Sequence, residues 1–79
     1  MARYFFDTDD GTTRFQDQDG TECADAESAR ALAARALAEL AAETISADSS
    51  QGTVTMWVRR GQDAPILQLA LNFGIRQLA

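Results

Sequence analysis

Alanine and leucine recur with helical spacing between Asp25 and Ile45, and this is the longest periodic segment of the chain. At 100° per residue, one face of a helix over residues 25–45 collects small apolar side chains. That inward face comprises Ala26, Ala29, Ala33, Ala36, Leu37, Leu40 and Thr44. The opposite face comprises Glu27, Ala31, Arg35, Ala38, Glu39 and Ala42. Asp25 is a typical N-cap, so the helix should begin there. Because its inward face is mostly alanine, the helix should pack closely on a surface that carries large side chains.

An aromatic stretch near the start of the chain predicts a first strand over residues 3–8. Three adjacent aromatic residues are typical of a central strand that is covered on both faces. We expect Tyr4 and Phe6 on the helix side of a sheet, where alanine needs bulky neighbours, and Phe5 on the other side. The Asp-Gly pair that follows, in residues 9–11, predicts a hairpin turn.

The polar residues 12–16 predict a short edge strand, with Thr13 and Phe15 directed inward. This strand completes a first hairpin within residues 1–17. Residues 17–20 predict a second turn because they combine aspartate with glycine, and the chain then leads into the helix.

Two alternating segments after the helix predict a second hairpin over residues 53–73, following a polar loop at residues 46–52. The first of these strands, residues 53–59, places Val54, Met56 and Val58 inward and Thr55, Trp57 and Arg59 outward. A turn around Gly61 connects it to the second strand, residues 66–73. That strand places Leu67, Leu69, Leu71 and Phe73 inward and Gln68, Ala70 and Asn72 outward.

The predicted fold is therefore a single α+β domain over residues 1–79, with the element order ββαββ and a tail at residues 74–79. The helix packs on one face of a four-stranded sheet. With strands numbered along the chain, the order 2-1-3-4 makes every neighbouring pair antiparallel. The order 2-1-4-3, which would make the first and fourth strands parallel, stays open.

Short motifs occur in a fixed order along most of the chain. They are RYFFDTDDG at residues 3–11, Asp17, Gly20, Asp25, Ala29-Arg30, VTMWV at residues 54–58, Gly61 and the closing leucine-rich strand. In order and spacing they resemble a family of small uncharacterised bacterial proteins, domain of unknown function 6894. The family usually has proline or leucine beside the capping aspartate, whereas Ala24 and Ala26 flank it here. The resemblance implies a small cytoplasmic bacterial domain, and it brings no known activity, cofactor or site residue.

Composition limits the possible functions. The chain has a net charge of −5 and no histidine, which argues against a polyanionic partner and against the commonest acid–base and metal-binding side chain. A lone cysteine, Cys23, excludes a disulfide within the chain. The N-terminus does not resemble a signal peptide, and no apolar run is long enough for a membrane span. We expect a soluble cytoplasmic protein without a membrane partner.

The side chains offer little chemistry. The acidic turns over residues 7–10 and 17–22 contain carboxylates, which calcium and magnesium prefer, but no closing bidentate ligand follows them. We interpret these aspartates as turn residues that accept local backbone hydrogen bonds. Cys23 has no histidine to activate it, and a small sheet with short loops offers no deep pocket. We therefore expect no metal, no cofactor and no enzymatic activity.

The sheet face opposite the helix is the most informative surface. The residue types that dominate protein interfaces fall there, and the hypothetical interface comprises Phe5, Trp57, Arg3, Arg14 and Arg59. The favoured prediction is a homodimer or higher oligomer that buries this face, and another protein partner stays possible. A purely structural role for the aromatic pair is the next alternative. Single-stranded nucleic-acid binding and an antitoxin-like regulatory role are further alternatives, and the acidic net charge argues against the first of them.

Overall fold

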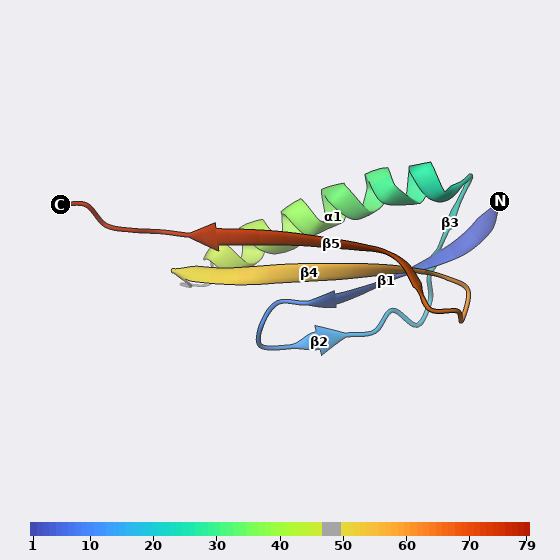
Figure 1. Ribbon diagram of the computed structural model, residues 1–79, viewed down its shortest axis with the longest axis horizontal. Helices are drawn as coiled ribbons and strands as arrows, with labels where there is room; N and C mark the ends of the chain where they lie inside the picture. Colours follow the sequence, from blue (N-terminus) through green and yellow to red (C-terminus); the bar gives the residue numbers. More distant parts are fainter. Residues whose placement is uncertain (47–49) are drawn as a thin grey trace.

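The computed structural model describes residues 1–46 and 50–79. The elements in chain order are β1 (Ala2–Asp9), β2 (Arg14–Phe15), β3 (Thr21–Cys23), α1 (Ala26–Ser46), β4 (Gln51–Arg60) and β5 (Pro65–Gly74). The sheet has the order β2-β1-β4-β5, and β3 pairs with β1 beside β2 (Figure 1). Every strand pair is antiparallel. The α+β class and the strand order 2-1-3-4 predicted from the sequence are confirmed, and the order with parallel strands is wrong.

One strand was missing from the prediction. β3 has only three residues and pairs with Ala2–Tyr4, whereas β2 pairs with Thr8 and Asp9 at the other end of β1. The two short strands therefore share one edge of β1, and residues 16–20 connect them. Three residues are too few for an alternating pattern to be recognised, so the sequence predicts only a connection to the helix here.

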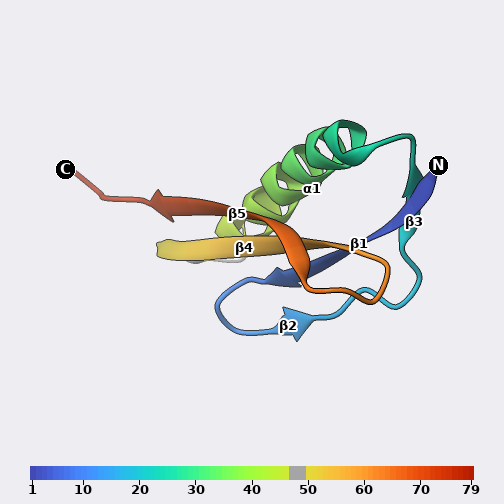
Figure 2. The same ribbon diagram turned by 45° about the vertical axis from the view of Figure 1, so that its right-hand side comes forward.

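The predicted cap of α1 is confirmed. The Ser28 backbone N–H donates to Asp25 Oδ1 at 2.8 Å, and the Ala29 N–H donates to the Asp25 carbonyl at 3.1 Å. The helix lies on one side of the sheet (Figure 2), where it packs mainly on β4 and β5. The predicted polar loop at residues 46–52 is shorter, because α1 extends to Ser46 and β4 begins at Gln51. Residues 47–49 of that prediction lie outside the described residues.

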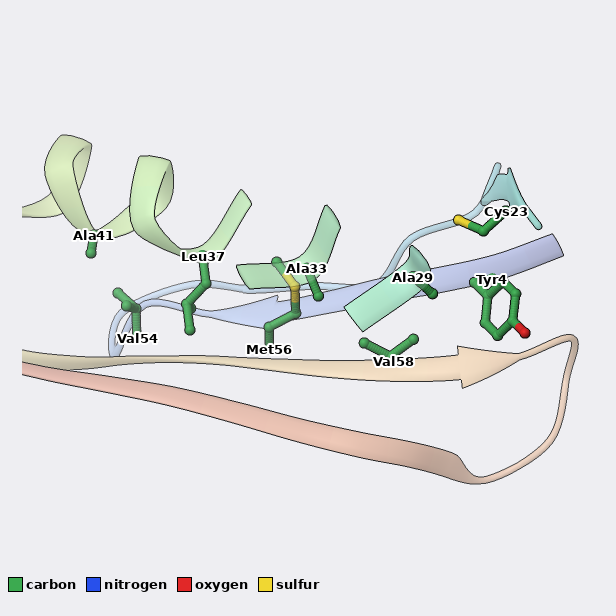
Figure 3. Close-up of a cluster of buried hydrophobic side chains, with 9 residues drawn as sticks. All are labelled: Tyr4, Cys23, Ala29, Ala33, Leu37, Ala41, Val54, Met56 and Val58. Carbon is green, nitrogen blue, oxygen red and sulfur yellow. The ribbon is translucent and has the colours of Figure 1, made fainter. Parts of the chain in front are cut away.

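The core forms between β4 and the buried stripe of α1, which consists of Ala29, Ala33, Leu37 and Ala41 (Figure 3). Its buried side chains are Tyr4, Cys23, Ala29, Ala33, Leu37, Ala41, Val54, Met56 and Val58. The predicted inward residues of β4 lie in this cluster, and Leu67, Leu69 and Leu71 of β5 pack against it, which confirms their inward direction. Phe73, also predicted inward, lies with its ring beside Gly52. Three helix positions differ: Ala26 is exposed, Ala41 is buried, and Leu32 packs against the core. The buried row advances four residues at a time, so the stripe drifts around the helix toward its C-terminal end.

The predicted inward direction of Thr13 and Phe15 is wrong. Both residues are exposed, and Phe15 is 57% exposed. Because α1 lies over β4 and β5, the edge strand β2 lies too far from the helix to bury a side chain against it (Figure 2). Among the described residues, no helix is long and apolar enough to cross a membrane.

Candidate interaction surface

The sheet face turned away from α1, called the open face below, differs from one end to the other. On β4 and β5 it is covered by a layer of polar side chains. The Trp57 indole N–H donates to Gln68 Oε1 at 2.8 Å, and the Thr53 hydroxyl donates to Asn72 Oδ1. These bonds join residues that lie opposite one another in the β4–β5 register. They fix the Trp57 ring in place and leave it half-buried.

At the other end of the open face lies a buried ion pair. The Arg59 Nε donates to Asp7 Oδ2 at 2.6 Å and its Nη2 donates to Asp7 Oδ1 at 3.1 Å, which is a bidentate arrangement. The remaining Arg59 donors reach the backbone carbonyls of Asp17 and Gly61. Arg59 is only 8% exposed, and its hydrogen bonds lower the pKa of Asp7. This arginine joins β1, β4 and two turns.

Phe5 lies under this arginine. Its ring centroid is 5.0 Å from the Arg59 guanidinium carbon, and Phe5 is 7% exposed. On its other side the backbone of Gly20 approaches so closely that a Cβ there would lie 2.9 Å from Phe5 Cε2. Asp17 holds this turn, because its carboxylate accepts the N–H groups of Phe6, Asp19 and Gly20. Phe5 is therefore covered by its own chain, and the exposed Phe5–Trp57 patch expected from the sequence does not exist.

What stays open is a hollow beside Trp57. It has a volume of about 270 Å³ and is lined by Asp7, Arg14, Phe15, Gln16, Trp57 and Pro65. The Arg14 guanidinium carbon lies 4.5 Å from the centroid of the Trp57 ring, which is a cation–π distance. Arg14 also pairs loosely with Asp9, at 3.8 Å. An exposed phenyl ring and a half-buried indole thus flank one exposed, positively charged side chain.

The five residues of the predicted interface fall into three groups. Trp57 and Arg14 lie together on the open face, as expected. Phe5 and Arg59 also lie together, but inside the chain. Arg3 is engaged at the β1–β3 edge, where it pairs with Glu22 at 3.2 Å and donates to the Asp19 carbonyl at 2.9 Å.

Sequence reasoning missed Asp7, Asp17 and Phe15 as parts of this surface. A signal for Asp7 was present, because it lies on the same face of β1 as Phe5 and the predicted strand order makes β4 its neighbour. Phe5 pairs with Arg59 and Asp7 pairs with Trp57 in the register, so the carboxylate lies diagonally across from the guanidinium. An aspartate in an aromatic strand therefore indicates a buried partner of opposite charge.

The acidic turns act as their sequence suggested. Asp9 accepts the Gly11 N–H, and Asp10 accepts the N–H groups of Thr12 and Thr13. These backbone bonds, above all that from Thr13, lower the pKa of Asp10. In the described part of the chain, no group of three or more histidine, cysteine, aspartate or glutamate residues is arranged to hold a metal ion. Cys23 is a free, buried thiol.

Comparison with known proteins gives one match. A family model described as a domain of unknown function (DUF6894) matches residues 3–72. No curated protein matches the chain, and no solved structure matches it either.

Proposed function

Because the family model covers residues 3–72, the chain belongs to the DUF6894 family, and we propose that it is a small, non-enzymatic oligomerisation module that associates through its open face. The proposed occupant of that face is a second copy of the chain. The hollow beside Trp57 is the observation that carries this proposal.

The chemistry of the hollow supports a protein partner. Tryptophan and arginine are the residue types most enriched among the side chains that dominate binding energy at interfaces. Trp57 is held rigidly by Gln68 and by the strand, so little side-chain entropy is lost when it is covered. Arg14 is two-thirds exposed, so its guanidinium stays accessible to a partner while it lies over the Trp57 ring. Phe15, which the core leaves uncovered, supplies further apolar area beside the ring.

The nucleic-acid alternative is weakened by the same geometry. A stacking platform needs aromatic faces together with arginines that can reach phosphates. Arg3 and Arg59 are already paired with Glu22 and Asp7, and Phe5 is covered. Trp57, Phe15 and Arg14 stay available beside the hollow, but a single arginine attracts phosphates weakly on a chain of net charge −5. We therefore propose protein association rather than RNA or DNA binding.

Absence of catalysis and a cytoplasmic location belong to the same proposal. The chain contains no histidine, and its only thiol is buried and so poorly placed to act as a nucleophile. A free thiol is also in keeping with a reducing compartment.

Removal of the indole tests the proposal. Trp57→Ala should lower the average mass measured by light scattering at micromolar concentration, because it deletes the anchor of the interface. Trp57→Phe is the matched control, since it keeps an aromatic ring at this position but loses the hydrogen bond to Gln68. Trp57→Phe should retain most of the wild-type mass. Equal masses for wild type and Trp57→Ala over the whole concentration range would contradict the proposal.

A further inference from the structure

The two edges of the sheet differ greatly in length. One edge is formed by β2 and β3, which have two and three residues and carry Arg14 and Glu22. The other edge is β5, with ten residues, and no described strand pairs with its outer side (Figure 1). Natural proteins usually protect a long edge with charge, with proline or with a covering element. β5 has only Pro65, at its first position.

The hydrogen-bond pattern shows which backbone groups of β5 are free. The Ile75 N–H donates to the Ser50 carbonyl, so odd-numbered residues of β5 direct their N–H and C=O groups toward β4. The bond from the Gly61 N–H to the Arg3 carbonyl shows that odd-numbered residues of β4 bond to β1. The even-numbered residues of β4 therefore bond to β5, which agrees with this assignment. The even-numbered residues of β5 thus direct their backbone groups to the free edge. In the regular part of the strand these are Gln68, Ala70 and Asn72.

This edge is also uncharged and apolar. No charged residue occurs from Ala64 to Ile75, whereas Asp63 and Arg76 lie at the two ends of that stretch. Of the five large hydrophobic side chains that are more than half exposed among the described residues, three belong to β5 or follow it: Ile66, Ile75 and Leu78. Unpaired backbone groups and exposed apolar side chains thus occur together on β5 and on the residues that follow it.

We propose that β5 pairs antiparallel with β5 of a second copy of the chain, so that two sheets join into one across a two-fold axis. The free groups restrict the register, because an even residue must face an even residue. Pairing about Ala70 places Gln68 opposite the partner's Asn72 and uses the strand over most of its length. Leu69 then lies opposite the partner's Leu71 on the helix side, so both sheet faces continue across the junction.

Charge complementarity favours a second copy over another strand. In this register, Arg76 of each chain lies opposite the partner's Ala64, one position from Asp63, so opposite charges come near one another at both ends of the joined strands. The exposed Ile75 of each chain likewise comes beside the partner's Ile66, which the single chain leaves uncovered. One two-fold operation therefore brings opposite charges together and covers exposed isoleucines at both ends of the strand.

The helices fit the same arrangement. α1 lies over β4 and β5, so two helices in the joined sheet would be about two strand spacings apart, ~10 Å, which is a normal helix–helix packing distance. The flank of α1 beside β5 includes Ala26 and Arg30, which border a hollow above Ile66 and Leu67. Ala34 and Ala38 follow on that flank at the next two turns and are exposed. Apart from Arg30, these flank positions carry only alanine, which allows the helices to approach closely.

Charge reversal across the two-fold axis tests the pairing. In the double variant Gln68→Lys/Asn72→Lys, like charges lie directly opposite one another in the proposed register, and Gln68→Glu/Asn72→Glu repeats this with negative charge. Each charged variant alone should have half the mass of the wild-type assembly. An equimolar mixture of the two variants should recover the mass of that assembly, because every lysine then faces a glutamate. Restored pairing in the mixture distinguishes a lost interface from a misfolded chain.

Amide hydrogen exchange followed by NMR gives an independent readout. The N–H groups of Gln68, Ala70 and Asn72 should be protected in the wild type and exchange fast in the lysine variant. Those of Leu69 and Leu71, which bond to β4, should stay protected in both. A monomeric wild type, charged variants that keep the wild-type mass, or a mixture that fails to associate would each overturn the pairing.

This inference uses a surface different from the one in the proposed function, and the two can fail separately. All mass measurements are therefore repeated in a Trp57→Ala background, which removes the proposed open-face contact. If the mass still halves on introducing the lysines there, the edge pairing holds whatever becomes of the open face. If only Trp57→Ala changes the mass, the open face associates and the edge pairing is wrong.

Discussion

Alanine substitutions of Gly20 and Gly61 form a matched pair that tests whether the turn at residues 17–20 packs against Phe5. Both glycines have positive φ angles, +72° and +68°, so alanine at either position has the same left-handed backbone strain, about 1–2 kcal/mol. Their surroundings differ. A Cβ on Gly61 would meet no atom within 4 Å, whereas one on Gly20 would lie 2.8 Å from Arg3 Cγ, 2.9 Å from Phe5 Cε2 and 3.0 Å from the Tyr4 carbonyl oxygen.

The contact at Gly20 adds a second cost. Arg3 Cγ belongs to a flexible side chain, but the Phe5 ring is enclosed and the Tyr4 oxygen belongs to a central strand, so neither can move freely. Overpacking of this kind typically costs a further ~1–3 kcal/mol. Gly61→Ala should therefore lower the free energy of unfolding by the strain alone, and Gly20→Ala by about twice as much or more.

Urea denaturation of both variants, followed by circular dichroism, measures the difference directly. In a domain of this size, ~1 kcal/mol corresponds to roughly 4–8 °C in melting temperature, so thermal unfolding provides a second readout. Equal losses of stability in the two variants would refute the reasoning, because they would mean that the turn at residues 17–20 does not press against Phe5.

Two further predictions concern the core and the ion pair. Ala33→Leu should destabilise the protein by ~1–3 kcal/mol because Ala33 is fully buried against β4, whereas Ala31→Leu on the exposed face should be nearly neutral in the same urea titration. Because folding lowers the pKa of Asp7 from its ordinary 3.8, ionised Asp7 contributes stability above that pH and loses it as the pH falls below. The stability difference between wild type and Asp7→Asn should thus shrink below about pH 3.8, and a difference that stays constant down to about pH 2 would contradict this role of the ion pair.

Periodic segments were predictable because their burial is regular. The inward Val54 and the inward leucines of β5 follow from a repeat of two residues, and the buried alanines of α1 from a repeat of 3.6. The cap at Asp25 follows from the residue type at the start of that repeat. β3 was not predictable in this way, since three residues contain no repeat. The drift that buries Ala41 instead of Ala26 depends on how the helix crosses the sheet, and this crossing is a property of the packed structure.

The candidate site was predictable only in part for a similar reason. Strand alternation placed Trp57 and Arg59 correctly on the open face, but it does not distinguish a side chain on an open face from one covered by a loop. The carboxylates of Asp7 and Asp17 decide this outcome, because they draw Arg59 and the turn at residues 17–20 over Phe5. Such contacts join residues up to 52 positions apart and leave no local sequence pattern.

The fluorescence of Trp57 during dilution tests the proposed association most directly, because it is the only tryptophan in the chain and lies at the centre of the open face. If a second copy covers that face, the emission maximum should lie at short wavelength at high concentration. It should then move to longer wavelength as dilution from high micromolar to nanomolar concentration separates the copies. An emission maximum that stays at the same wavelength over the whole series would contradict the account.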